Sequence, residues 1–397
     1  MLKFDIEKKQ GLARVGIIHI PHGDIRTPAF VGAATRATVK ALTMKEMNEL
    51  GSQAILANTY HLILRPGTEL IKKAGHLAKF SGWNKPTFTD SGGFQIFSLP
   101  NVKISEEGVK FRSYLDGSRF ELTPETSMQA QWNIGADIHM AFDHLAKSEN
   151  RRDMVSAMER THAWLDRCVA EHERIKEELG MAGDDPKGDH QNACGSKILG
   201  EEGRQDPPVE QYLYAVVQGG TFNDLRAESA RYCASKNVDG FGIGGVFTAD
   251  GMAEMLQVVN NILPENKPRH LLGMGEEPID LFDGAENGCD TFDCVGPTRM
   301  ARNGSLYTLD GRINIKNAKF KEDFSPLMTD CDCELCRHHT RAYLHHLFRT
   351  DEITAKVLAS IHNERFVVRT VDNIRESLLN GTFENYKRDF LARYYHK

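Results

Sequence analysis

The stretch PTFTDSGG (residues 86–93) contains the pattern that decides the fold. A few apolar and β-prone residues lead into an aspartate, a serine and two glycines, which is typical of the end of a buried strand. The same kind of run, apolar and then small or polar, recurs seven more times, at TPAFVGA (27–33), AILANTYH (54–61), DIHMAFD (137–143), LYAVVQGG (213–220), GFGIGG (240–245), RHLLGMG (269–275) and TFDCV (291–295). The sequence therefore predicts eight strands.

Amphipathic helical patterns lie between several of these strands, at residues 43–50, 151–179, 225–236, 250–263 and 278–288. Strands that alternate with helices indicate parallel βαβ units, and eight such units fit a closed (β/α)8 barrel of the TIM type. The alternative is an open doubly wound sheet. That fold normally carries a glycine fingerprint after its first strand, and AFVGAATRATVK has none. We predict an α/β fold with this barrel as the catalytic domain over residues 1–325.

Four segments lie outside the eight-strand pattern. Residues 12–30 predict a hairpin that turns at residues 22–23 and covers the N-terminal end of the barrel, and residues 100–118 predict a smaller hairpin that turns at residues 116–117. Residues 180–208 are polar and rich in glycine and proline, which predicts a long loop insertion. After residue 325 the strand pattern stops, so we predict an appended helical subdomain over residues 326–397.

Composition excludes a membrane protein. No run of about 18 apolar residues occurs, and MLKFDIEKKQGLARVG lacks the apolar core of a signal peptide, so we expect a soluble cytoplasmic protein. The net charge is −6, but it is unevenly distributed. Residues 298–397 hold 17 Lys+Arg and 13 Asp+Glu, a net charge of +4, whereas the remainder holds 32 and 42, a net charge of −10. A basic C-terminal quarter is compatible with a phosphate backbone as partner.

Three cysteines, Cys331, Cys333 and Cys336, crowd into six positions, and His362 follows in the helical pattern AKVLASIHNERF. Three thiolates and one imidazole form a closed tetrahedral Zn²⁺ shell of the structural kind. An iron–sulfur cluster is an alternative, and four other histidines compete for the fourth position: His338, His339, His345 and His346. The five remaining cysteines are scattered, which predicts buried thiols in a reducing compartment: Cys168, Cys194, Cys233, Cys289 and Cys294.

Active sites of such barrels lie at the C-terminal ends of the strands. The polar and glycine residues that the pattern places there are Asn58, Asp90, Asp143, Gln218, Gly244, Gly245, Gly273, Gly275 and Asp293. A lone aspartate at a strand end is commonly a helix cap, but three aspartates at one barrel mouth favour a catalytic site. One carboxylate can attack an anomeric carbon and a second can move protons. A glutamine and an aspartate can pair with a purine edge, and an aromatic ring can stack on its face.

The segments TFTDSGGFQIFSL, GFGIGG, LLGMG and TFDCVGPTRMAR, with the cysteine and histidine pattern, resemble the tRNA-guanine transglycosylases. The resemblance runs from about residue 4 to residue 395 and implies a (β/α)8 barrel with a zinc-binding subdomain. It implies that Asp293 is the nucleophile and Asp90 the general acid/base. It also assigns base recognition to Asp143, Gln218, Gly244 and Gly245, and the pocket lining to Ser91, Gly92, Gly93 and Phe94.

Two further segments match those that contact the anticodon loop in the family. They are Gly273, Met274, Gly275, Glu276, Glu277, Pro278 and Ile279, and then Thr298, Arg299, Met300, Ala301 and Arg302. Arg299 and Arg302 are the expected contacts to phosphates or base edges. The resemblance implies a structural zinc on Cys331, Cys333, Cys336 and His362 and a homodimer.

The activity that the resemblance implies is exchange of the wobble-position guanine of tRNA for a 7-deazaguanine. The aminomethyl form, preQ1, is the leading candidate, queuine is the runner-up, and a preQ0-inserting enzyme would usually carry further RNA-binding domains. The chain departs from the common bacterial pattern beside the base pocket, with HLAKSE after Asp143, Val246–Thr248 after Gly245, and Phe94 for a tyrosine. A non-catalytic tRNA-binding subunit would lack Asp293, and a zinc hydrolase would need an open metal position at the barrel mouth.

Overall fold

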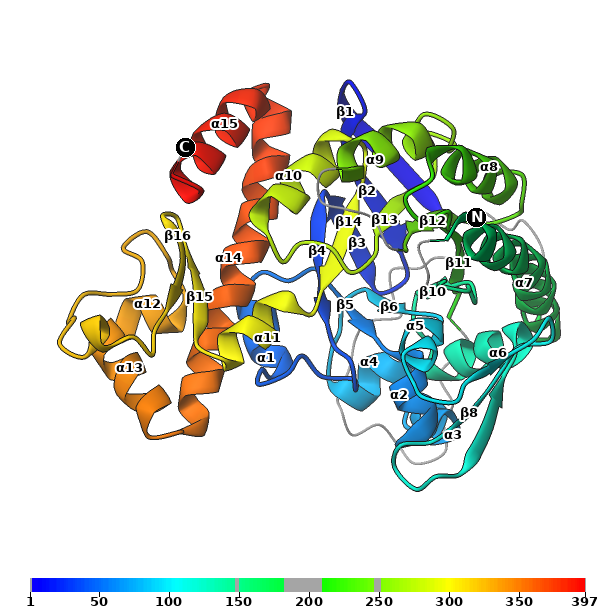
Figure 1. The fold of residues 1–397 in the computed structure, drawn as a ribbon, viewed down its shortest axis with the longest axis horizontal. Helices are drawn as coiled ribbons and strands as arrows, with labels where there is room; N and C mark the ends of the chain where they lie inside the picture. Colours follow the sequence, from blue (N-terminus) through cyan, green and yellow to red (C-terminus); the bar gives the residue numbers. More distant parts are fainter. Residues whose placement is uncertain (1, 147–149, 182–208, 246–250, 397) are drawn as a thin grey trace.

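The computed structural model describes residues 2–146, 150–181, 209–245 and 251–396 (Figure 1). Its centre is a closed barrel of eight parallel strands. In their order around the barrel they are β10 (Ile138–Met140), β11 (Tyr212–Val217), β12 (Gly240–Ile243), β13 (Arg269–Leu271), β14 (Thr291–Cys294), β4 (Ala29–Ala33), β5 (Ala54–Ala57) and β6 (Thr87–Thr89). The first and last strands of the barrel in the sequence, β4 and β14, pair with each other and close it. The predicted barrel is confirmed.

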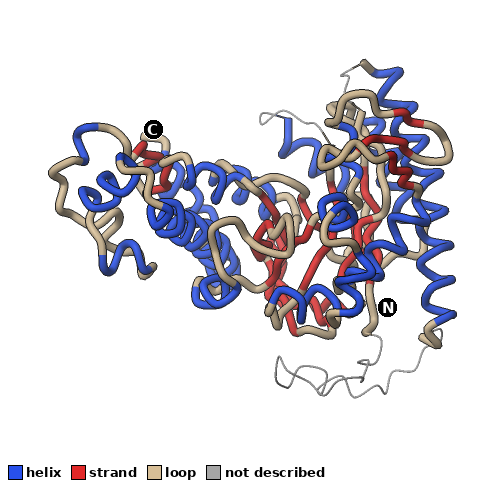
Figure 2. Tube along the Cα trace, turned by 90° about the horizontal axis from the view of Figure 1, so that it is seen from below, coloured by secondary structure: helices blue, strands red, loops and turns tan. Residues whose placement is uncertain are grey.

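Helices follow the strands and lie outside the barrel (Figures 1 and 2). They are α1 (Met44–Glu49), α2 (Thr59–Leu64), α3 (Thr68–Lys73), α4 (His76–Ser81), α5 (Gly93–Phe97), α6 (Pro124–Ile134), α7 (Arg151–Glu178), α8 (Asn223–Ala234), α9 (Met252–Asn260), α10 (Pro278–Glu286) and α11 (Gly296–Arg302). The five predicted helices are present within a few residues. Local chemistry fixes their ends. For example, Thr43 caps α1 by accepting from the Glu46 amide, and the Glu46 side chain accepts from the Thr43 amide.

Several predicted strands were too long at their C-terminal ends. In AILANTYH the strand stops at Ala57, and Asn58 caps α2 by accepting from the amide of His61 at 3.0 Å. In RHLLGMG it stops at Leu271. The small and polar residues that end each run leave the sheet and form the loops at the barrel mouth, because their side chains and flexible backbones suit caps and turns.

A three-stranded antiparallel sheet, β1 (Lys3–Gln10), β2 (Ala13–Ile20) and β3 (Gly23–Thr27), covers one end of the barrel. The predicted turn was one residue late, since Ile20 pairs with Gly23 and leaves residues 21–22 as the turn. The sheet is anchored at residues that precede barrel strands. His22 bonds Asp137 at 2.6 Å, and the buried Arg14 guanidinium pairs with Asp290, with Nε donating at 2.8 Å. This is the N-terminal end of the barrel, as predicted.

The second predicted hairpin is a small three-stranded sheet made of β7 (Lys103–Ile104), β8 (Val109–Arg112) and β9 (Arg119–Leu122). Its β8–β9 turn contains residues 116–117, as predicted, but the sheet continues to Leu122 rather than ending at residue 118. Most of the predicted insertion at 180–208, namely residues 182–208, lies outside the described residues.

The C-terminal region forms a lobe beside the barrel (Figure 1). It contains β15 (Ser305–Thr308), β16 (Gly311–Asn314), the short 3-10 helix η3 (Ala318–Phe320), α12 (Glu334–His338), α13 (Arg341–Arg349), α14 (Ile353–Asn380) and α15 (Phe383–Tyr394). The long helix α14 joins the lobe to the barrel, because Arg375 donates to the Pro28 carbonyl at 2.9 Å. The division at residue 325 stays a prediction. In the part of the chain that the structure describes, no helix is long and apolar enough to cross a membrane.

Candidate active site and metal centre

Asp90 follows β6 and is held at the barrel mouth by the start of α2. The amide of Thr59 donates to Oδ1 at 2.9 Å, the amide of Gly92 donates to the same oxygen at 3.1 Å, and the Asn58 side chain donates to Oδ2. The Thr59 hydroxyl donates to the Asp90 carbonyl at 2.6 Å. Two strand ends, those of β5 and β6, thus fix one carboxyl group.

The pKa of Asp90 is raised to about 7. Burial is the main cause, and the charge of the nearby Asp293 acts in the same direction, while the donors from Thr59, Gly92 and Asn58 oppose both. A carboxyl group with this pKa is available as an acid and as a base near neutral pH. Both aspartates lie at the C-terminal ends of barrel strands, with Asp90 directly after β6 and Asp293 on β14.

Asp293 lies on β14, opposite Val31 of β4, with its side chain 12% exposed. One carboxylate oxygen, Oδ1, accepts from the Gly273 amide at 2.9 Å and lies 3.1 Å from Nε2 of His270. Gly273 has φ +72°, a conformation in which glycine carries no steric cost. The Thr291 hydroxyl lies 2.8 Å from Nδ1 of His270 and holds the ring. The other oxygen of Asp293 accepts no hydrogen bond from the described residues and remains available for chemistry.

Asp143 and Gln218 form a connected polar pair at the ends of β10 and β11. Nε2 of Gln218 donates to Oδ2 of Asp143 at 2.7 Å, and the Ser91 hydroxyl donates to Oδ1 at 2.9 Å. Burial raises the pKa of Asp143. Gly245, at φ +103°, lies so close that a Cβ there would stand 2.7 Å from Oε1 of Gln218. Only glycine suits this position.

Arg226 of α8 joins the loops that carry these groups. Its buried guanidinium donates to three carbonyl oxygens: Val217 at 3.0 Å, Gly220 at 2.8 Å and Gly244 at 2.6 Å. Burial lowers its pKa to about 9. Sequence reasoning missed this residue, because an arginine in the amphipathic pattern 225–236 reads as a solvated side chain. His270 was missed for a similar reason, since a histidine inside a buried strand gives no signal of its partner.

Phe94, predicted to stack on a base, lies on the first turn of α5 with 62% of its surface exposed. Gly92 and Gly93 form the turn between it and Asp90, and a Cβ on Gly93 would lie 3.0 Å from the carbonyl of Asp143. Residues 90–94 therefore connect Asp90 with Asp143, because Ser91 and Gly93 both contact Asp143.

The two segments predicted to contact RNA meet at the mouth. Arg299 of α11 pairs with Glu276. Glu277 pairs with Arg312 at 2.7 Å, and the Tyr307 hydroxyl donates to the Glu276 carbonyl at 2.6 Å. On α11, Arg299 and Arg302 have accessible side chains. Other members of the two predicted sets are buried: Gly275, Pro278, Thr298, Met300 and Ala301. Those that are exposed or partly exposed are Gly273, Met274, Glu276, Glu277 and Ile279.

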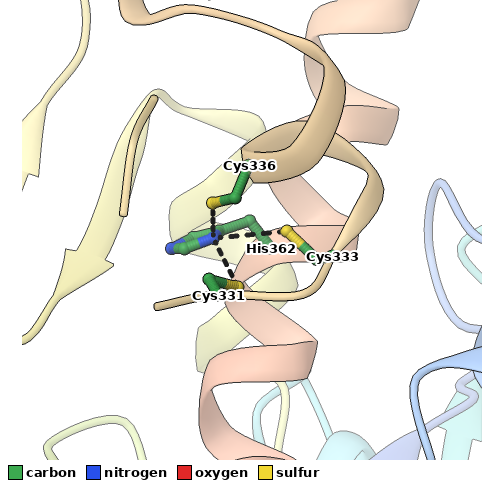
Figure 3. Close-up of side chains that lie close together, drawn as sticks. All are labelled: Cys331, Cys333, Cys336 and His362. Atoms are coloured by element: carbon green, nitrogen blue, oxygen red, sulfur yellow. Dashed lines mark hydrogen bonds between the residues drawn. The ribbon is translucent and has the colours of Figure 1, made fainter. Parts of the chain in front are cut away.

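The four predicted metal ligands lie together in the C-terminal lobe and could hold a metal ion. Cys331, Cys333 and Cys336 place their sulfur atoms 3.7, 3.6 and 3.3 Å from Nδ1 of His362 (Figure 3). A tetrahedral zinc with ordinary bond lengths requires sulfur–nitrogen separations of about 3.6 Å. All four residues are buried, and Nε2 of His362 donates to the Tyr307 carbonyl at 2.8 Å, which leaves Nδ1 free to bind metal.

The competing histidines are placed elsewhere. His345 bonds the Ile315 carbonyl at 2.8 Å, and His338 faces Glu334 at 3.7 Å. Within the described ranges, the group of Cys331, Cys333, Cys336 and His362 is the one cluster with metal-binding geometry. The scattered cysteines that the structure describes, Cys168, Cys233, Cys289 and Cys294, are buried free thiols, as predicted, and Cys194 lies outside the described residues.

Comparison with known proteins places this geometry in a family. A family model described as "Queuine tRNA-ribosyltransferase" matches residues 8–396. The chain is 42% identical to the queuine tRNA-ribosyltransferase of Herpetosiphon aurantiacus, over 98% of this chain and 92% of the relative. It is 41% identical to that of Desulforamulus reducens, over 98% of each chain, and 42% identical to that of Pelotomaculum thermopropionicum, over 96% and 95%. The chain belongs to the queuine tRNA-ribosyltransferase family.

Proposed function

We propose that this protein is a tRNA-guanine transglycosylase that exchanges guanine at the wobble position of tRNA for a 7-deazaguanine during queuosine synthesis. The observation that carries the proposal is the joint placement of two carboxyl groups, Asp90 and Asp293, at one barrel mouth with the Asp143–Gln218 pair. Family membership supports the same activity. For the incoming base we propose preQ1, with queuine as its competitor.

The proposed nucleophile is Asp293. The Gly273 amide donates to Oδ1 of Asp293, and this hydrogen bond fixes the orientation of the carboxylate and therefore the position of its second oxygen. Attack of that oxygen on the anomeric carbon forms an ester and breaks the bond to N9 of guanine. The incoming base then attacks the same carbon through its own N9 and releases the carboxylate. Two displacements at one carbon retain its configuration.

In this proposal Asp90 is the general acid and general base of the reaction. In its protonated form it gives a proton to the departing guanine, and the resulting carboxylate takes a proton from the incoming base. A pKa of about 7 suits both tasks. Asp143 and Gln218 pair with the edge of the base, and Ser91, Gly92, Gly93, Gly244 and Gly245 form the walls around it. We propose that Phe94 stacks on its face.

We also propose that the cluster of Cys331, Cys333, Cys336 and His362 holds one structural zinc ion. The donor set is complete without water, so the ion would stabilise the lobe and take no part in the reaction. The anticodon loop is the proposed RNA partner. A homodimer is the proposed assembly.

The activity is tested by incubating the purified protein with tRNA and labelled guanine. Incorporation of the label supports transglycosylation, and its absence with correctly folded protein would refute it. Competition by preQ1, queuine and preQ0, each at the same concentration, then ranks the incoming bases. A non-catalytic subunit would bind tRNA without incorporating label.

Replacing Asp143 with alanine is expected to weaken guanine exchange at least about tenfold. A buried recognition group left without its partner costs about 1–3 kcal/mol, and Gln218 loses its acceptor as well. The measurement is kcat/KM for guanine at saturating tRNA. Asp351→Ala, at an exposed carboxylate of the lobe, is the matched control. Wild-type kinetics in the Asp143 variant would make that residue a structural cap.

The two half-reactions are expected to respond to pH in opposite directions. Formation of the ester needs protonated Asp90, so its rate should fall as pH rises through about 7. Discharge of the ester by an incoming base needs the carboxylate, so its rate should fall as pH decreases through the same value. Rapid-quench measurement of each step separates them. Asp90→Asn should remove both dependences and slow both steps, and an unchanged profile in that variant would assign the proton transfer elsewhere.

A further inference from the structure

Side chains of helix α6 join the site residues that follow β6 to those that follow β10. Asp90 and Ser91 come directly after β6, and Asp143 comes after β10. The two strands are neighbours in the barrel, but their backbone pairing ends with His139 opposite Thr89. The segments that carry the site lie beyond this last pair, and α6 supplies contacts that hold them together.

Gln131 of α6 bonds to the end of β10 as a neighbouring strand would. Its side chain is fully buried. Nε2 donates to the Met140 carbonyl at 2.9 Å, and Oε1 accepts from the Met140 amide at 3.2 Å. The Thr89 hydroxyl donates to the same Oε1 at 2.9 Å. One side-chain amide thus holds the end of β10 to the end of β6, next to Asp90.

Ser127, one helical turn before Gln131, extends this contact to the base-recognition groups. Its side chain is also fully buried, and its hydroxyl donates to the Ser91 carbonyl at 2.8 Å. The Ser91 hydroxyl in turn donates to Oδ1 of Asp143 at 2.9 Å. Nε2 of Gln131 donates to the Ser127 hydroxyl at 3.3 Å. A hydroxyl group has one proton to donate, so this bond leaves the proton of Ser127 for the Ser91 carbonyl.

The series of contacts ends on a carboxylate whose two oxygens are both held by side chains. Ser91 donates to Oδ1 of Asp143, and Gln218 donates to Oδ2 at 2.7 Å. These two donors fix the plane of the carboxylate and therefore the directions of its remaining lone pairs. A binding group that is already held in its working orientation loses less free energy when the ligand arrives.

We propose that Ser127 and Gln131 are positioning residues for base recognition, and that they act on the Asp143 carboxylate through Ser91. Both side chains are fully buried, so neither is placed to touch the base itself. The inference deepens the proposed function and rests on it. It assigns a role in recognition to α6, a helix outside the motifs from which the site was predicted.

The test measures guanine exchange by full-length Ser127→Ala at saturating tRNA. This change removes a single oxygen atom, so the variant should fold, and thermal unfolding checks that it does. Loss of one orienting hydrogen bond should raise KM for guanine about fivefold and leave kcat within about twofold of the wild type. Gln131→Met keeps the length of the side chain and removes its amide, so it should raise the same KM.

A double-mutant cycle with Ser91→Ala separates positioning from general support of the fold. If Ser127 acts through the Ser91 hydroxyl, adding Ser127→Ala to Ser91→Ala should raise KM by less than a further factor of about two, because the contact that it orients is already lost. A purely structural role would leave the two effects independent, and the increase of about fivefold would recur.

Ser52→Ala is the matched control. Ser52 is equally buried, and its hydroxyl donates to the Ala54 carbonyl at 3.1 Å, at the N-terminal end of β5. This variant should keep the wild-type KM. Wild-type KM in either folded α6 variant, a loss confined to kcat, or fully independent effects in the cycle would overturn the proposal. Failure of the proposed function would look different, since the wild type itself would then exchange no guanine.

Discussion

Replacing Asp293 with alanine is expected to abolish base exchange and the covalent protein–tRNA adduct while leaving tRNA binding intact. The Asp293 carboxylate is the proposed nucleophile, and alanine has no oxygen to accept from the Gly273 amide or to attack the sugar. Removing a nucleophile of this kind typically costs at least about 10⁴-fold in rate. The phosphate and base contacts lie on other residues, so binding should persist.

Two measurements check this. Guanine exchange gives the rate, and denaturing electrophoresis with the incoming base withheld shows whether an adduct survives. Asp351→Ala is a suitable control, because that aspartate is exposed and pairs with Lys356 in the C-terminal lobe. Near-normal exchange in the Asp293 variant would overturn the nucleophile assignment. An adduct mapped to Asp90 would reverse the two roles.

The second large effect is expected at the metal cluster. Cys333→Ser should lose zinc and unfold much of the C-terminal lobe, because binding of a structural zinc contributes about 10–16 kcal/mol to folding. Metal analysis should give about one zinc per chain in the wild type and far less in the variant. Limited proteolysis should then cut the lobe. Cys289→Ser, a buried thiol outside the cluster, should retain its zinc. A full complement in the Cys333 variant would contradict the assignment.

Loss of the zinc ion should also disturb the position of Asp293 in the active site. His362 donates to the Tyr307 carbonyl, and the adjacent Asn363 donates to the Pro297 carbonyl of α11 at 3.0 Å. Helix α11 begins two residues after β14, which holds Asp293. Exchange activity is therefore expected to fall together with zinc content.

The eight strands were predictable because each is a local pattern, an apolar run followed by residues that cap or turn. Asp90, Asp143, Gln218 and Asp293 could be predicted for the same reason, since strand ends in a barrel meet at one mouth. The spacing of Cys331, Cys333 and Cys336 indicated a metal site, whereas spacing alone left five histidines open for the fourth position, and the fold brings His362 to the three sulfur atoms.

What the sequence did not reveal depends on contacts between distant segments. Strand β1 was missed because KFDIEKKQ is mostly polar and gains its partner only from β2. Arg226 has an ordinary place in an amphipathic helix, and its role becomes visible when β11 and β12 bring three carbonyl groups around it.

The closure of the barrel between β4 and β14 has a consequence for synthesis on the ribosome. Val31 of β4 pairs with Asp293, and Arg14 of β2 pairs with Asp290, so β4 and the N-terminal sheet gain these partners only when residues near 290 have been synthesised. Until then β4 has an unpaired edge, a condition that favours association with other chains. We expect the growing chain to depend on chaperones up to this length and to become resistant to protease in a single late step. Nascent chains arrested at increasing lengths would reveal that step.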